Sequence, residues 1–384
     1  RFENPEKKVQ ERQKRSYPLG KQKYLTRRRF QLLFLHNFSC IKIKQNNPFQ
    51  LSSKTTTFLT SFEKRLFTSS VHSFNDLCVE LFQFQYDNNK TYRAYCDLIN
   101  VKPEKINEFT KIPFLPISAF KSHEMKCGSF KAEATFTSSG TGGQTSRHLV
   151  KNLNLYEKSF QLGFEHFYNE IEEYCVLGLL PSYLEREGSS LIYMVNDFIK
   201  KSSHPKSGFF LNNQVDLYIV LKELVKKNTK VLLIGVSFAL LDFADRYQIE
   251  ASENLIVMET GGMKGRRKEL IREELHVTLC TSFGVKHIHS EYGMTELLSQ
   301  AYSKGNGVFE TPPWMKVLIR EQDDPFKMVK PRQAGAINII DLANSSSCAF
   351  LRTDDLGIDV SDSQFKVLGR LDVSDLRGCN LMVS

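Results

Sequence analysis

The chain has 384 residues, of which 41% are hydrophobic and 25% charged, values typical of a globular protein with a substantial core. The net charge of +9 comes from residues 1–65, where 16 Lys and Arg accompany 4 Asp and Glu, so the remainder carries a small negative charge. A nucleic-acid-binding surface over the whole chain is therefore not indicated. No apolar run approaches the roughly 18 residues that span a bilayer, which predicts a soluble protein.

The cysteines show neither a CxxC pair nor another metal-ligand spacing. They are Cys40, Cys78, Cys96, Cys127, Cys175, Cys280, Cys348 and Cys379. Scattered cysteines of this kind are typical of reduced thiols in a cytosolic protein. We therefore expect a cytoplasmic location and no zinc site.

Residues 1–62 are rich in Lys, Arg, Gln, Asn and Thr, and the stretch "KTTTFLTSFEKR" shows no sustained helical or strand period. The chain begins at Arg1 rather than at a methionine. Three interpretations remain open: a disordered basic arm, an organelle-targeting segment, or sequence that is not part of the native protein. We expect the functional domain to span residues 63–384.

The first globular pattern is "FNDLCVELFQFQYDNNKTYRAYCDLI". Phe74, Leu77, Leu81 and Phe84 recur at three-to-four-residue spacing, which predicts an amphipathic helix that breaks at residues 87–89. The following "KIPFLPISAFKS" holds two prolines and predicts an irregular connection.

Beyond Val150, short apolar runs alternate with helical patterns, which predicts an α/β fold with a buried, largely parallel sheet. The predicted strands are 174–180, 230–236, 254–260 and 285–293, and the predicted helices are 188–202, 238–247 and 263–276. From residue 308 to 384 the pattern changes to short strands and hairpins, which predicts a smaller β-rich C-terminal section.

Four loops carry chemistry-bearing residues. "TSSGTGG", residues 137–143, combines hydroxyls with glycines that allow close approach of the backbone to phosphate, although it lacks the lysine of a Walker loop. "SEYGMTE" (290–296), "LRTDDLG" (351–357) and "LGRLDVSDLRGCN" (368–380) follow in that order. Each alone also fits a plain connector, a turn, a solvated acidic pair or a frayed tail.

Taken together and in this order, the four loops resemble those of adenylate-forming enzymes, which activate a carboxylate with ATP. Within that superfamily the chain resembles the acyl-protein synthetases, the LuxE-type long-chain-fatty-acid–protein ligases of fatty acid reductase complexes. Further stretches that carry the resemblance are "IPFLPISAFKSH", "METGGMKGRR", "HSEYGMTELLSQAYS" and "TPPWMKVLIRE". The resemblance extends from about Leu66 to the C-terminus and implies the large-domain architecture of that superfamily.

The resemblance also implies roles for individual residues and the cofactors ATP and Mg²⁺. The residues implied to hold the ATP phosphates are Ser138, Ser139, Gly140, Thr141 and Gly143. Those implied around the rest of the nucleotide are Tyr292 at the adenine, Thr295 at the α-phosphate, Glu296 at Mg²⁺, Asp355 at the ribose with Arg370 beside it, and Gly261 and Gly262 lining the nucleotide and acyl pocket. Gly142 and Thr145 depart from the superfamily's usual loop, which weakens the assignment of any single phosphate contact.

The largest departure is at the C-terminus. The chain stops at Ser384, so we expect it to lack the superfamily's mobile C-terminal domain with its catalytic lysine. The resemblance instead implies Cys379 as the acyl acceptor and a fatty acid reductase protein as the partner that takes the acyl group. No GxGxxG follows a strand, so reduction is expected elsewhere. Two alternatives stay open: an acyl- or aryl-CoA ligase, and a non-catalytic nucleotide-binding subunit.

Overall fold

The computed structural model describes residues 53–68, 73–138, 144–181, 188–210, 213–261 and 270–371, all within one compact unit that spans Asn47–Ser384. Several predicted site residues lie outside the described residues. They are Ser139, Gly140, Thr141, Gly143, Gly262 and Cys379.

Among the described residues, twelve strands form one sheet in the order β11-β12-β13-β14-β10-β9-β8-β7-β6-β4-β5, with β1 added on β13. The parallel half consists of β4 (Cys175–Leu179), β5 (Gly208–Phe209), β6 (Val231–Gly235), β7 (Leu255–Glu259) and β8 (His289–Tyr292). All residues of β4 and β6 are buried, which explains why these strands are continuous apolar runs.

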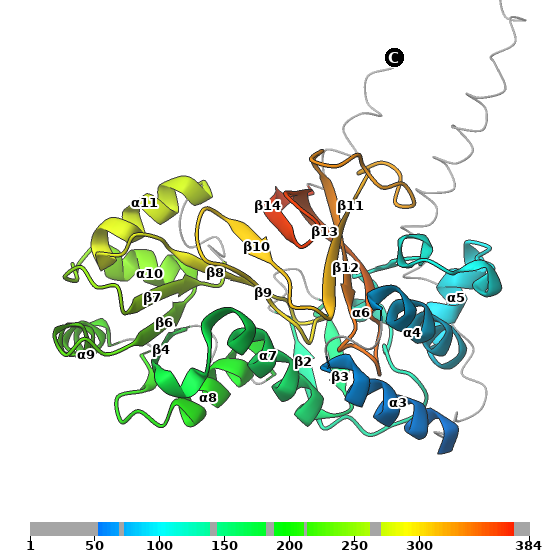
Figure 1. Cartoon of the computed structure of the whole chain (residues 1–384), viewed down its shortest axis with the longest axis horizontal. Helices are drawn as coiled ribbons and strands as arrows, with labels where there is room; N and C mark the ends of the chain where they lie inside the picture. Colours follow the sequence, from blue (N-terminus) through cyan, green and yellow to red (C-terminus); the bar gives the residue numbers. More distant parts are fainter. Residues whose placement is uncertain are drawn as a thin grey trace, which may run out of the picture. The chain divides into compact units, whose positions relative to one another are not determined.

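Helices cover both faces of the parallel half, as Figure 1 shows. Below the strands lie α7 (Leu153–Tyr168) and α8 (Ser190–Ser202), and above them lie α10 (Ser237–Ala244) and α11 (Arg272–Phe283), with α9 (Gln214–Lys226) toward the β4 edge. Phe243 of α10 stacks on Phe283 of α11 with ring centroids 5.2 Å apart. On the other face, Phe164 of α7 packs against Phe198 of α8 at 5.0 Å.

The second half of the sheet is antiparallel. It contains β9 (Ala301–Ser303), β10 (Val308–Glu310), β11 (Met315–Arg320), β12 (Gly335–Asp341), β13 (Phe350–Asp359) and β14 (Gln364–Arg370). The predicted β-rich C-terminal section is therefore present, but its strands continue the same sheet through the β8–β9 pair. Every residue of β12 is buried, because helices pack on this half as well.

The N-terminal helices pack on the antiparallel half (Figure 1). They are α3 (Ser53–Leu66), α4 (Phe74–Asn88), α5 (Lys90–Leu98) and α6 (Ala119–Ser122), with 3₁₀ turns at Pro103–Lys105 and Phe109–Lys111 and the short strand β1 (Leu115–Pro116). A third 3₁₀ turn, Ile171–Glu173, lies between α7 and β4 in the parallel half. The predicted break between α4 and α5 is confirmed, because Asn89 caps α5 by accepting from the Tyr92 N–H. Gln85 anchors α4 by donating to the carbonyl of Asn344 at 2.8 Å.

Two expectations about helices were wrong. No regular structure was expected up to residue 62, yet α3 begins at Ser53, and Leu59 and Phe62 are buried in the core. Tertiary burial of three apolar residues outweighs the weak helical propensity of the threonine run. The helix predicted over 263–276 instead runs from Arg272 to Phe283, where Gly284 ends it in a left-handed conformation with φ of 62°.

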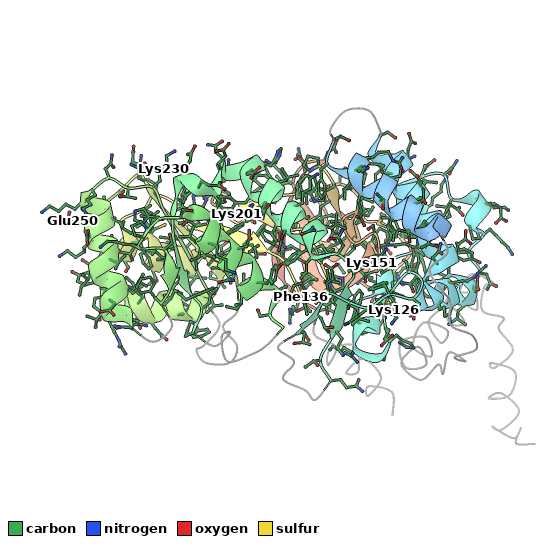
Figure 2. The ribbon with its side chains drawn as sticks, turned by 90° about the horizontal axis from the view of Figure 1, so that it is seen from below. Lys126, Phe136, Lys151, Lys201, Lys230 and Glu250 are labelled. Atoms are coloured by element: carbon green, nitrogen blue, oxygen red, sulfur yellow. The ribbon has the colours of Figure 1, made fainter. Side chains whose placement is uncertain are left out.

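A separate two-stranded hairpin presents the glycine- and hydroxyl-rich loop. It pairs β2 (Ala134–Thr137) with β3 (Arg147–Val150), and Phe136 lies opposite His148 in the register. In Figure 2, Phe136 and Lys151 lie on the side of Lys126, whereas Lys230 and Glu250 lie toward the β4 and β6 edge of the sheet.

Candidate functional site

The carboxyl end of β8 and the strand pair β13–β14 bring three predicted nucleotide residues together. The Tyr292 hydroxyl donates to Asp355 Oδ2 at 2.7 Å, and Arg370 Nε donates to Asp355 Oδ1 at 3.2 Å. Arg370 lies opposite Asp355 in the β13–β14 register, which explains the contact. Phe309 and Phe365 pack edge-on against the Tyr292 ring and hold it in place. The result is an oriented carboxylate beside an aromatic ring.

The base of the predicted phosphate loop is closed by two hydrogen bonds between Ser138 and Ser146. The Ser138 N–H donates to the Ser146 carbonyl at 3.1 Å, and the Ser146 N–H donates to Ser138 Oγ at 2.9 Å. Thr137 is also fixed, because its N–H donates to the carbonyl of Gly188 at 2.8 Å. The Ser138 hydroxyl thus accepts a bond within the loop base and keeps one proton to donate.

Thr295 and Glu296 follow β8 in a segment that packs against this loop base. The Thr295 carbonyl lies 2.8 Å from His148 Nδ1, and the Glu296 carbonyl accepts from Asn344 Nδ2 at 2.8 Å. Burial raises the pKa of the Glu296 carboxyl, while the side chain of Ser146 beside it acts in the opposite direction. The Glu296 side chain is 6% exposed, so its carboxylate meets solvent or a ligand over a small area.

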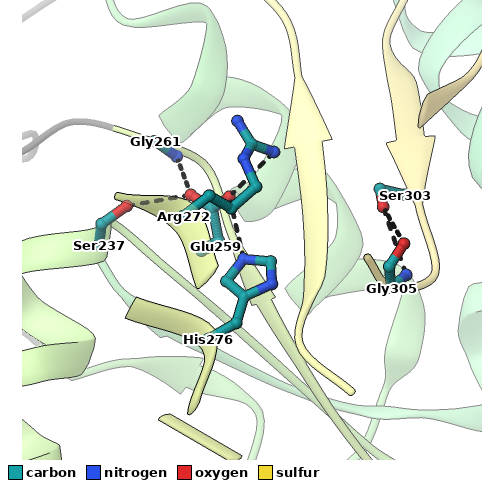
Figure 3. A network of polar contacts seen from close by, with 7 residues as sticks. All are labelled: Ser237, Glu259, Gly261, Arg272, His276, Ser303 and Gly305. Atoms are coloured by element: carbon teal, nitrogen blue, oxygen red, sulfur yellow. Dashed lines mark hydrogen bonds and ion pairs between the residues drawn. The ribbon is translucent and has the colours of Figure 1, made fainter. Parts of the chain in front are cut away.

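A polar network at the carboxyl end of β7 was not predicted (Figure 3). The buried Glu259 carboxylate accepts from the Gly261 N–H at 2.6 Å and from Ser237 Oγ at 3.0 Å. Arg272 and His276, from the start of α11, approach its other oxygen at 3.9 and 3.8 Å, distances too long for direct hydrogen bonds. Burial acts to raise the pKa of Glu259, but the surrounding donors and the Arg272 charge outweigh it and hold this pKa at about 2.

The charge of Glu259 affects a second buried carboxyl on the neighbouring strand. Glu291 is 9% exposed, and burial together with the negative charge of Glu259 raises the pKa of Glu291 to about 8. Glu291 lies opposite Tyr302 in the β8–β9 register, and the buried Tyr302 hydroxyl has no hydrogen-bond partner within the part of the chain that the structure describes. Two adjacent strands therefore carry one ionised and one largely protonated carboxyl at neutral pH.

Gly261 takes part in this network through its backbone. It adopts φ of 71°, a conformation that side chains other than glycine rarely adopt, and its carbonyl accepts from the Ser237 N–H at 3.3 Å. A Cβ at this position would meet no atom of the described residues within 4 Å. The positive φ is therefore the feature that favours glycine at Gly261.

The structure thus brings Tyr292, Asp355 and Arg370 into contact and places Thr295 and Glu296 against the loop base at Ser138. Sequence reasoning missed Glu259, Ser237, Arg272 and His276, and it left His148 without a role. The signal for Glu259 was present, because a carboxylate directly after a buried strand and before two glycines is exposed to the same edge as the other loops.

A pocket of about 250 Å³ lies two strands from β7 along the same edge, at the end of β4 and the starts of α9 and α10. Its lining includes Asp242, Arg246, Asn213 and Gln214 together with Leu179. Because so much of this lining is charged or polar, the pocket is poorly suited to an aliphatic chain.

Within the described ranges, no helix has both the length and the apolarity needed to cross a bilayer.

The sequence matches one protein family over most of its length. The profile of the family described as acyl-protein synthetase, LuxE, matches residues 62–164 and 197–384. A long-chain-fatty-acid–luciferin-component ligase of Vibrio harveyi is 25% identical over 331 residues, covering 79% of this chain and 85% of the relative. Its namesake in Aliivibrio fischeri is 24% identical over 356 residues, covering 85% and 92%.

Solved structures show the same fold at low identity. 2-Hydroxyisobutyryl-CoA ligase with 2-HIB-AMP and CoA in an open conformation aligns with a TM-score of 0.54 at 11% identity, over 78% of this chain and 70% of that one. The same ligase in its thioesterification state aligns with a TM-score of 0.52 at 11% identity, over 83% of this chain and 69% of that one. ATP-bound MatB from Rhodopseudomonas palustris gives 0.47 at 13%, over 63% of this chain, which spans about half (49%) of MatB. The first two alignments confirm the predicted α/β architecture of adenylate-forming ligases.

Proposed function

Because the chain belongs to the acyl-protein synthetase (LuxE) family of ligases and has the fold of adenylate-forming enzymes, we propose that it activates a long-chain fatty acid with ATP and transfers the acyl group to Cys379. The observation that carries the proposal is the carboxylate of Asp355 on β13, held between Tyr292 and Arg370. A carboxylate oriented in this way can accept both hydroxyls of a ribose, while the Tyr292 ring borders the adenine.

The remaining proposed nucleotide contacts come from the other loops that resemble those of adenylate-forming enzymes. Ser138, with Ser139, Gly140, Thr141 and Gly143 outside the described residues, would cradle the phosphates through N–H and hydroxyl donors. Glu296 supplies a carboxylate of the kind Mg²⁺ prefers, and the structure sets it beside Ser146 of the loop base. When bound, Mg²⁺ would neutralise charge on the phosphates. Gly261, and Gly262 beyond the described range, would border the nucleotide and acyl group.

The chemistry proceeds in two displacements. A carboxylate oxygen of the fatty acid attacks the α-phosphorus, the bond to the bridging oxygen breaks, and pyrophosphate leaves with the electron pair. Thr295 would donate to the α-phosphate, where charge accumulates. The Cys379 thiolate, after losing its proton to solvent, then attacks the acyl carbon; the bond to the phosphate oxygen breaks and AMP leaves. The product is a thioester that a fatty acid reductase protein can take up.

Two further expectations accompany this proposal. We propose that the catalytic domain covers residues 63–384 together with the rest of α3, because Leu59 and Phe62 of that helix are buried in the core. We also propose that the chain acts in the cytoplasm; all six cysteines within the described ranges are free thiols, as expected for a reducing compartment. The rival is an acyl- or aryl-CoA ligase, since the aligned 2-hydroxyisobutyryl-CoA ligase was solved with CoA.

The proposal is tested by intact mass after incubation with Mg·ATP and tetradecanoic acid, with and without hydroxylamine. We expect a hydroxylamine-labile acyl adduct on Cys379 and its loss in Cys379→Ala, with fatty-acid-dependent ATP–pyrophosphate exchange retained in that variant. Cys280→Ala is the matched control and keeps the adduct. Acyl-CoA formation that is unaffected in Cys379→Ala would favour the rival, and ATP binding without exchange would favour a non-catalytic subunit.

A further inference from the structure

A buried histidine joins the phosphate-loop hairpin to the segment that follows β8. His148 of β3 is fully buried, and its Nδ1 lies 2.8 Å from the carbonyl oxygen of Thr295. A carbonyl oxygen only accepts hydrogen bonds, so Nδ1 must carry a proton and donate it. The tautomer of the ring is therefore determined by this contact, and the contact spans 147 residues of sequence.

The other side of the ring lies beside Asn344. The Asn344 amide nitrogen donates to the Glu296 carbonyl at 2.8 Å and also faces Asp341 Oδ2 at 3.3 Å, which determines the orientation of the amide. Asn344 Oδ1 and His148 Nε2 are both buried, and neither has a hydrogen-bond partner among the described residues. Burial lowers the pKa of His148 to about 4, so the neutral ring with its single proton on Nδ1 is the form at neutral pH.

The residue two positions earlier contacts the same segment. Ser146 closes the base of the phosphate loop by donating its N–H to Ser138 Oγ at 2.9 Å, and its side chain lies beside the Glu296 carboxylate. Ser146 and His148 point to the same side of the strand, as residues i and i+2 do. One short stretch of chain therefore fixes the loop base, the Thr295 backbone and the Glu296 side chain together.

We propose that His148 is a positioning residue for adenylation, which holds Thr295 and Glu296 in register with the phosphate loop. This inference rests on the proposed function, because it assumes that the loop and the Thr295–Glu296 segment act on one nucleotide. They come from different parts of the fold, the separate β2–β3 hairpin and the large sheet. Their relative placement therefore depends on the contacts between them, and a misplacement of about 1 Å can lower a rate roughly 100-fold.

The hydrogen bond can be separated from the packing of the ring. Phe120 of α6 packs edge-on against His148 with centroids 5.6 Å apart, and any apolar side chain of similar size could retain much of that packing. His148→Leu therefore removes the donor while keeping a filled core. His148→Asn returns an amide N–H close to the position of Nδ1. Phe120→Leu is the matched control, since it alters the packing and leaves the donor in place.

The first measurement is fatty-acid-dependent ATP–pyrophosphate exchange by the full chain, with circular dichroism and thermal unfolding to confirm folding. For His148→Leu we expect kcat to fall about 10-fold or more while the KM for ATP changes less than threefold, because binding at Asp355 is unaffected. His148→Asn should recover most of the rate, and Phe120→Leu should stay within threefold of wild type. Equal rates for His148→Leu and Phe120→Leu would overturn the inference.

A second measurement does not require turnover. Hydrogen–deuterium exchange of the nucleotide-free chain should be faster at residues 293–297 in His148→Leu than in wild type, and close to wild type in His148→Asn. Unchanged exchange at 293–297 would overturn the inference even if no variant were active. If wild type itself shows no pyrophosphate exchange but the deuterium result holds, the proposed function fails while the positioning contact stands.

Discussion

The carboxylate of Asp355 accepts hydrogen bonds from Tyr292 and Arg370, whereas its neighbour Asp354 is exposed and turns away. Asp355→Asn should raise the KM for ATP by roughly 10- to 100-fold, the effect of about 1.5–3 kcal/mol for hydrogen bonds to a charged group. The KM for ATP is measured from steady-state ATP–pyrophosphate exchange at varied ATP concentration. Asp354→Asn is the matched control, and an equal rise in both variants would argue against a ribose contact at Asp355.

Glu291 gives the stability of the protein a predicted pH dependence. Its pKa is raised in the folded state to about 8, so it contributes stability that is complete below the unfolded value near 4.5 and is lost as the pH rises through 8. Glu291→Gln removes this titration. Urea unfolding at pH 5, 6.5 and 8 should show wild type losing up to about 1.4 kcal/mol per pH unit relative to the variant. Parallel profiles would mean that Glu291 titrates normally.

Individual residues were predictable to different degrees. Tyr292, Asp355 and Arg370 were found because each belongs to a motif that the resemblance covers, and the structure joins them by hydrogen bonds. Tyr292 and Arg370 end their strands, whereas Asp355 lies within β13. His148 was not found, because its role depends on a partner 147 residues away, Thr295, and such a partner cannot be read from local spacing. Glu259 was overlooked although it ends a buried strand, while its partner His276, 17 residues later, could not be read from local spacing.

At the scale of single elements, the carboxyl end of β12 supports the segment that follows the candidate site. The buried Asp341 accepts from the N–H groups of Leu298 at 2.7 Å and Ser299 at 3.1 Å, and from Ser299 Oγ at 2.6 Å. Asp341→Asn would replace one carboxylate oxygen by an amide N–H₂, which cannot accept from these N–H and O–H donors. We therefore expect a loss of roughly 2–4 kcal/mol in the free energy of unfolding.

Urea unfolding measures the effect of Asp341→Asn, with the exposed Asp362→Asn as the matched control. The adenylation rate of Asp341→Asn should fall only at urea concentrations near its unfolding midpoint, where the folded fraction falls too. The reason is that Asp341 bonds to the backbone of Leu298 and Ser299 and not to the predicted nucleotide residues. A urea midpoint for Asp341→Asn equal to that of wild type would show that the buried network tolerates an amide.

Elements with strong apolar patterns were predicted well, and elements that depend on tertiary packing were not. The strands β4, β6, β7 and β8 were expected from their apolar runs, because both faces of a parallel sheet are covered. The helices α3, α7 and α9 were missed. In α3 the apolar face is short and threonine-rich, so only tertiary burial makes the helix favourable, as the stacking of Phe58 on Phe84 of α4 at 4.1 Å shows.

At the scale of the whole molecule, the described thiols are protected. Cys78, Cys96, Cys127, Cys175 and Cys348 are buried and Cys280 is half-buried, and burial raises the pKa of each. Thiol reactivity requires the thiolate, so these groups should react slowly in the native protein. Iodoacetamide at pH 7.5 should label them at least 10-fold more slowly than in urea.

Peptide mass spectrometry after short labelling measures this protection. An acyl-accepting thiol has to be accessible, so we expect label to accumulate first at Cys379 or Cys40, which lie outside the described residues. Prior incubation with Mg·ATP and fatty acid should then block Cys379 and leave Cys40 reactive. Rapid native labelling of Cys348 would contradict the burial on which the prediction depends.

The pairing of β1 with β13 has a consequence for how the protein is made. Leu115 lies beside Leu351, and Gln85 and Asn89 bond to the backbone near residues 344–347, more than 230 residues later in the chain. At about 5–20 residues per second, the N-terminal helices emerge from the ribosome roughly 10–50 s before their packing surface exists. During that interval Phe82 and Tyr92 lack the Phe350 ring that later covers them, so the nascent chain is a natural client for chaperones.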